Sequence, residues 1–114
     1  MATRIQVLIL EDRPADVRLM VHELRRAGFD PRWTSVDNEL EYLAHLSNEL
    51  DIILADYNLP QFDALRALER LKEHELDVPF ILVSGTIGEE LAVAAMKQGA
   101  SVYLLKHRLA RLGP

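Results

Sequence analysis

Residues 5–12, which read IQVLILED, decide the fold class of this 114-residue chain. The apolar residues are mostly branched and follow one another with a single polar break. This pattern indicates a strand that is buried on both faces, as in parallel sheets covered by helices on both sides. The strand runs directly into two acidic residues, Glu11 and Asp12.

A helix is expected immediately after this strand. Pro14 suits the first turn of a helix, where its missing N–H costs nothing. Apolar residues then recur at helical spacing from Val17 to Leu24, and Gly28 is expected to cap the carboxyl end.

The same alternation of strand and helix continues along the chain. The second strand, at 32–36, is short and of mixed polarity, which suggests an edge position. Asp37 or Asn38 is expected to cap the second helix, which carries leucines to Leu46. Further strands are expected at 51–55, 80–83 and 102–105, and further helices at 64–74 and 89–98. This order predicts an α/β fold with a parallel sheet between two helical layers.

Length and composition set further limits. A chain of 114 residues fits one domain, so residues 1–114 are assigned to a single unit. The net charge of −5 argues against direct binding of nucleic acid, which draws on Lys and Arg. A small basic cluster near the end is interpreted as a helix start or a solvated tail; it comprises Lys106, His107, Arg108 and Arg111.

No stretch of the sequence has the length and apolarity of a membrane span, and the first apolar run is too short for a signal peptide. We therefore expect a cytoplasmic protein that does not bind membranes. The absence of cysteine excludes disulfides and thiolate metal sites.

Polar residues stand where the predicted strands end. Asp12, Asp56, Ser84 and Lys106 follow four different strands. In an open parallel sheet the carboxyl ends of the strands share one edge, where ligands bind. Clustered carboxylates repel one another unless a hard cation such as Mg²⁺ binds them, and a carboxylate can also attack phosphorus.

Each of these residues has an ordinary structural interpretation. Asp12 could be a helix N-cap, Asp56 and Ser84 could be turn residues, and Lys106 could be solvated. Their joint placement at strand ends favours a functional site.

With these strand-end residues the chain resembles the receiver domain of two-component response regulators. The resemblance covers nearly the whole chain and is specific because several motifs occur in order. These are residues 7–12 (VLILED), 52–60 (IILADYNLP), 80–85 (FILVSG) and 99–106 (GASVYLLK).

The resemblance implies a doubly wound, flavodoxin-like sheet of five parallel strands in the order 2-1-3-4-5. It also implies that Asp56 is the phosphoacceptor. Asp12, Asp56 and the backbone carbonyl of Asn58 would bind Mg²⁺ or Mn²⁺, with Glu11 acting through water.

Three further residues match positions that respond to the phosphoryl group. Ser84 resembles the hydroxyl residue that follows the phosphoryl group, and Lys106 resembles the lysine that pairs with Asp56 and assists its chemistry. Tyr103 matches the aromatic whose rotamer reports the switch, although a half-buried strand tyrosine is the alternative.

The resemblance further implies a phosphorylation-dependent signalling switch. The phosphoryl donor would be a phosphohistidine on a sensor histidine kinase or a histidine phosphotransfer protein. Such a domain assists its own phosphorylation and dephosphorylation but is not an enzyme that turns over a separate substrate.

The chain departs from the family pattern at two places. Ala64 stands where many receivers have glycine, and the chain ends eight residues after Lys106, room for about two helical turns. The final helix is therefore expected to be truncated or absent, leaving apolar surface beside the first helix. A longer parent chain, a homodimer or a domain swap could cover it.

Three other functions fit the sequence less well. A receiver-like binding module without phosphorylation has no need of the full set of polar residues. A phosphohydrolase of the aspartyl-nucleophile type would have a second aspartate where Asn58 stands. A flavin or nucleotide carrier would have a glycine-rich phosphate loop after the first strand, where Glu11 and Asp12 stand instead.

Overall fold

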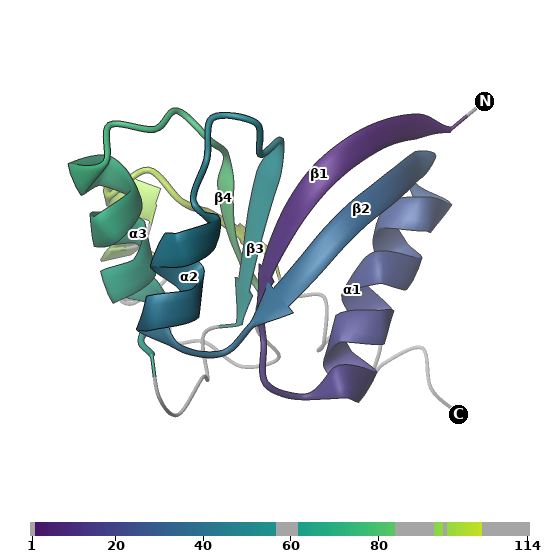
Figure 1. Cartoon of the computed structure of the whole chain (residues 1–114), viewed down its shortest axis with the longest axis horizontal. Coiled ribbons are helices and arrows are strands. Elements are labelled where there is room, and N and C mark those ends of the chain that lie inside the picture. The colour runs from purple at the N-terminus through teal and green to yellow at the C-terminus, as the bar shows by residue number, and fades with distance from the viewer. Residues whose placement is uncertain (1, 57–61, 84–92, 95, 104–114) are drawn as a thin grey trace.

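The computed structural model describes residues 2–56, 62–83, 93–94 and 96–103. Within these residues, parallel strands form one sheet in the order β2-β1-β3-β4-β5 (Figure 1). The strands are β1 (Thr3–Leu10), β2 (Phe29–Val36), β3 (Ile52–Asp56), β4 (Phe80–Val83) and β5 (Ser101–Tyr103). The predicted flavodoxin-like fold is confirmed for strands in the order 2-1-3-4, and the short β5 pairs with β4 beyond them.

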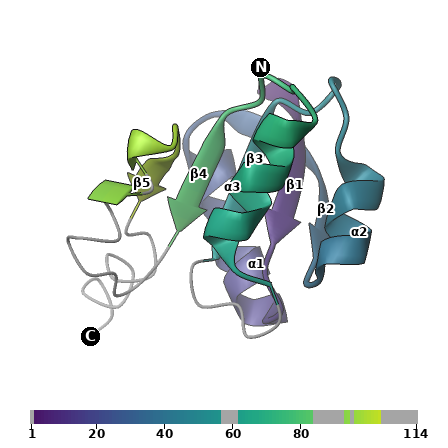
Figure 2. The same ribbon diagram turned by 90° about the vertical axis from the view of Figure 1, so that its left-hand side faces the viewer.

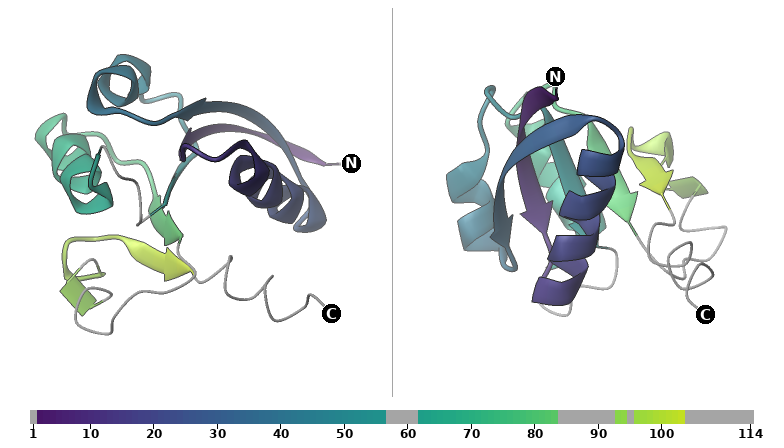
Figure 3. Two further views of the ribbon diagram at one scale, coloured as in Figure 1. Left: turned by 90° about the horizontal axis from the view of Figure 1, so that it is seen from below. Right: turned by 90° about the vertical axis from the view of Figure 1, so that its right-hand side faces the viewer.

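Helices cover both faces of the sheet. Helix α1 (Pro14–Arg26) lies on one face, and α2 (Glu39–His45) and α3 (Ala64–Glu73) lie on the other (Figures 2 and 3). No helix in the described part of the chain is long and apolar enough to cross a membrane. The sequence predicted a helix at 89–98; residues 93–94 and 96–97 are helical, and the rest of that range except Gln98 lies outside the described residues.

The ends of α1 follow from its sequence. Pro14 opens the helix, as predicted, but the N-cap residue is Arg13 and makes no side-chain cap. Asp12 is therefore not the N-cap. After the C-cap Ala27, Gly28 takes a φ of 97°, a left-handed conformation that glycine adopts without steric cost.

The second strand begins earlier than the predicted residue 32, because its pairing with β1 continues back to Phe29 opposite Thr3. Pro31 does not interrupt this pairing. The Val36 carbonyl accepts a hydrogen bond from the Glu11 amide (2.9 Å), so the even-numbered residues of β2 direct their backbone groups towards β1. Pro31 lies on the outward side of this edge strand, where no ladder bond is lost.

The third strand is shifted by one residue from the predicted 51–55. Asp51 precedes β3. Its carboxylate accepts a hydrogen bond from the backbone amide of Gln6 (2.7 Å), and its own backbone amide donates to the backbone carbonyl of Gln6 (2.9 Å). Asp51 thus closes the start of the β1–β3 pair from outside the ladder.

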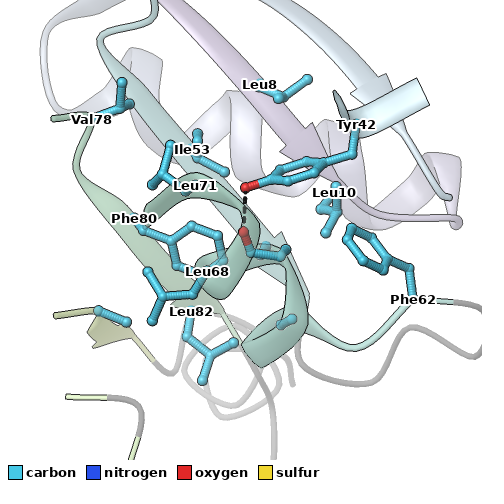
Figure 4. Close-up of a cluster of buried hydrophobic side chains, with 14 of the residues drawn as sticks. Leu8, Leu10, Tyr42, Ile53, Phe62, Leu68, Leu71, Val78, Phe80 and Leu82 are labelled. Carbon is cyan, nitrogen blue, oxygen red and sulfur yellow. Dashed lines mark hydrogen bonds between the residues drawn. The ribbon is translucent and has the colours of Figure 1, made fainter. Parts of the chain in front are cut away.

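The larger core lies between the sheet and helices α2 and α3 (Figure 4). Tyr42 is fully buried there, with its ring centroid 5.3 Å from that of Phe62. Its hydroxyl donates a 2.8 Å hydrogen bond to the Ala67 carbonyl in α3. Tyr42 therefore joins α2 to α3 with both an apolar ring and a satisfied polar group.

A second cluster packs α1 against the opposite face of the sheet and is less fully covered. An apolar groove of about 220 Å³ remains between α1 and the β3–β4 pair. Its apolar lining includes Met20, Leu24, Ile52, Leu54, Ile81 and Val83. The predicted truncation of the last helix, and the uncovered surface that it would leave, depend on residues outside the described part.

Tyr42→Phe is expected to lower the free energy of unfolding at neutral pH by about 1 kcal/mol, the usual net value of one hydrogen bond. Burial raises the pKa of the Tyr42 phenol above its ordinary value of 10.0. The unfolded chain then loses this proton first as pH rises, so the tyrosine's contribution is complete below pH 10 and declines above it.

Urea unfolding of both proteins across neutral to alkaline pH measures this effect. The wild-type protein should lose stability above pH 10 more steeply than the phenylalanine variant, so their difference should narrow. Parallel curves would show that Tyr42 does not titrate differently in the folded state.

Candidate functional site

The carboxyl ends of β1 and β3 meet at one edge of the sheet. The register pairs Leu10 with Ala55, so the next residues along, Glu11 and Asp56, come to the same edge. Asp56 is the last residue of β3 and lies opposite Val83 of β4. The edge is thus built by three adjacent parallel strands, as the sequence predicted.

Three carboxylates gather at this edge. Glu11, Asp12 and Asp56 each offer one oxygen, and these oxygens all lie within 4.8 Å of one another. Glu11 and Asp56 are each only 3% exposed, whereas Asp12 is exposed. Among the described residues no other group of three or more His, Cys, Asp or Glu side chains meets in this way.

The orientation of Glu11 is set by local hydrogen bonds. Its Oε2 accepts from the backbone amides of Asp12 (2.9 Å) and Arg13 (3.3 Å), while its own amide is held by the Val36 carbonyl. Arg13 is the N-cap of α1, so this carboxylate oxygen of Glu11 lies beside the positive end of the helix dipole. Amide donors and the dipole offset part of the cost of burying a carboxylate.

The donor set fits a hard divalent cation. Close carboxylate oxygens repel one another, and Mg²⁺ or Mn²⁺ prefers carboxylate and carbonyl oxygen ligands. The combination of two buried acids and one exposed acid leaves one side of the group open to water, which Mg²⁺ usually retains in its coordination shell.

The structure brings together Glu11, Asp12 and Asp56 as predicted. The other predicted positions, Asn58, Ser84 and Lys106, lie outside the described residues, as does the side chain of Tyr103. The backbone of Tyr103 belongs to β5 and is paired with Val83, the residue before Ser84.

The two amides that bind the Glu11 carboxylate were not predicted from the sequence, where Glu11 was expected only to act on the metal through water. The signal was the turn Glu11-Asp12-Arg13-Pro14, in which the backbone amides of Asp12 and Arg13, just before the helix begins at Pro14, can bind the preceding acid.

Known proteins share the sequence pattern of this chain. The sequence model of the response regulator receiver domain matches residues 7–112. The regulatory protein AtoC of Escherichia coli is 29% identical over 103 residues, which cover 89% of this chain and 22% of AtoC. The chain spans roughly a fifth of the length of the first curated relatives it matches.

Solved structures share the fold. The Mn²⁺-bound form of response regulator Rcp1 has a TM-score of 0.70 at 24% identity, covering 88% of this chain and 79% of that one. The CheX–CheY–BeF₃–Mg²⁺ complex from Borrelia burgdorferi has a TM-score of 0.74 at 23% identity, covering 95% and 86%. Because the receiver match extends over most of the sequence and the acidic edge lies where the motifs predict it, the chain belongs to the response regulator receiver domain family.

Proposed function

We propose that this domain is a phosphorylation-dependent signalling switch that accepts a phosphoryl group on Asp56 with the help of Mg²⁺. The observation that carries the proposal is the convergence of Glu11, Asp12 and Asp56 within 4.8 Å at the carboxyl edge of the sheet. The family assignment supports the same role.

In the proposed reaction, one oxygen of the Asp56 carboxylate attacks the phosphorus of a phosphohistidine. The new O–P bond replaces the N–P bond, and the donor imidazole takes up a proton to become neutral histidine. Water later cleaves the acyl phosphate and releases inorganic phosphate. The domain would thus act on itself rather than turn over a separate substrate.

Bound between the carboxylates, Mg²⁺ would supply positive charge to the transferring phosphoryl oxygens. Asp12 and Asp56 would hold it, together with the carbonyl of Asn58, and Glu11 would orient a bound water. Manganese- and magnesium-containing structures of Rcp1 and CheY support this assignment for the family. Ser84 and Lys106 are proposed to contact the phosphoryl group, and Tyr103 to respond to it.

The donor is proposed to be a sensor histidine kinase or a histidine phosphotransfer protein, and the cytoplasm is proposed as the compartment. An alternative is a receiver-like binding module that works without phosphorylation. The buried acidic pair disfavours this alternative, because a module with no ligand gains nothing from placing carboxylates where they repel.

Phosphorylation is tested by incubating the protein with acetyl phosphate and Mg²⁺ and measuring its intact mass. We expect the mass of one added phosphoryl group, which disappears in Asp56→Asn and when the cation is chelated. Asp77→Asn, an exposed carboxylate before β4 at the other end of the sheet, serves as the control and should be modified normally. Equal modification of Asp56→Asn would place the phosphoryl group elsewhere.

Metal binding is tested through stability. Without divalent cation, Asp12→Asn should raise the free energy of unfolding by about 1 kcal/mol, because it removes one charge from a repelling group. Saturating Mg²⁺ should raise the melting temperature of the wild-type protein, since a ligand of the folded state stabilises it.

The same Mg²⁺ addition should raise the melting temperature of Asp12→Asn much less, and that of Asp77→Asn as much as wild type. A similar Mg²⁺ response in all three proteins would argue against the proposed metal ligands.

A further inference from the structure

A second groove lies away from the carboxylates, between α1 and the edge strand β2. It has a volume of about 600 Å³. It is lined from β2 by Trp33 and from α1 by three apolar residues and three residues with basic side chains, namely Ala15, Leu19, Val21, Arg18, His22 and Arg25. These two elements lie side by side in Figures 1 and 3.

The polar residues on the helix side of the groove all have basic side chains. Arg18, His22 and Arg25 follow one another by four and three residues, so they share one face of α1. This local charge is opposite in sign to the net charge of −5 of the whole chain.

The two arginines of the groove, like Arg4 and Arg13, lack the ion pairs that other arginines of the described part make. Arg26 pairs with Glu23 (3.1 Å), and Arg70 pairs with Glu39 (2.9 Å) and Glu73 (2.7 Å). In the described part of the chain, neither Arg18 nor Arg25 has an ion pair. Their positive charge is therefore available to a partner.

The strand side of the groove is apolar. Trp33 is 41% exposed although it is a large aromatic residue, and it is the only tryptophan of the chain. Its register partner is Val7, which belongs to the cluster on the α1 face, so Trp33 lies on the same side of the sheet as α1. Tryptophan and arginine are the residues most enriched at energetically important positions of protein interfaces.

We propose that this groove docks an acidic segment of a protein partner. Arg18 and Arg25 are seven residues apart on the helix, which corresponds to a separation of roughly 10 Å along its axis. A matching segment would present two carboxylates about this distance apart, two helical turns or three extended residues, with an apolar side chain between them for Trp33.

This docking is separate from the proposed phosphoacceptor chemistry and uses none of its residues. Nucleic acid is disfavoured as the occupant because the net charge of the whole chain is negative, which repels phosphates over longer distances than the groove attracts them. An acidic protein segment places only a few charges against the local basic face.

The test uses a short fluorescein-labelled peptide of glutamate and leucine. It contains one pair of glutamates two helical turns apart and another pair three residues apart. We expect it to bind with an affinity that falls as salt is added, and to change the emission of Trp33. Counterparts with glutamine or lysine in place of glutamate should bind at least about fivefold more weakly, because a close charge pair contributes about 1 kcal/mol.

Arg18→Glu and Arg25→Glu should each weaken binding of the glutamate peptide at least about fivefold, again because each loses one charge pair. Lys72→Glu is the matched control: Lys72 is an exposed cation of α3, on the opposite face of the sheet, and its reversal should leave binding unchanged. Circular dichroism and phosphorylation by acetyl phosphate establish that each variant is folded and retains the proposed chemistry.

Four outcomes would overturn the proposal. These are no binding of the glutamate peptide, equal binding of its lysine counterpart, equal losses in Lys72→Glu and the groove variants, or tighter binding of an oligothymidylate than of the peptide. Because phosphorylation is measured in the same variants, failure of docking is distinguished from failure of the proposed switch.

Discussion

The architecture depends on the parallel pairing of β1 with both of its neighbours. β1 pairs with β2 on one side and with β3 on the other, and its residues Val7, Leu8, Ile9 and Leu10 are buried. Alternate residues face the two helical layers, so one strand contributes to both hydrophobic clusters. The last paired residue of β1 also determines where Glu11 and Asp12 lie at the carboxyl edge of the sheet. A one-residue change in this register would exchange the faces of the strand and separate Glu11 from Asp56.

The acidic edge combines two demands that oppose each other. Removing the Glu11 and Asp56 carboxylates from water costs solvation free energy, whereas a cation site needs acidic side chains at this position. The structure meets this conflict locally, through two backbone amides at the start of α1 that bind the Glu11 carboxylate. The helix start is therefore part of the site, and Pro14 contributes to it by opening the helix immediately after the acidic pair.

Much of this arrangement could be predicted from the sequence, because dense branched residues and strand-terminal acids carry strong local signals. The bounds of β4 and the start of α3 at Ala64 were predicted correctly. The early start of β2 was missed because residues 29–31 lack a continuous apolar run, and their strand conformation follows from pairing with β1. The Tyr42–Ala67 hydrogen bond could not be predicted either, since it joins residues 25 positions apart through packing of two helices.

Pro31 has a consequence for how the molecule behaves among other copies of itself. The outer edge of β2 exposes backbone groups that another chain could pair with, and long free edges of this kind promote aggregation. Pro31 is buried, and because its backbone nitrogen faces outward it removes one hydrogen-bond donor from that edge. An incoming strand would therefore find one donor fewer at Pro31, two residues before the exposed Trp33 on the same edge strand.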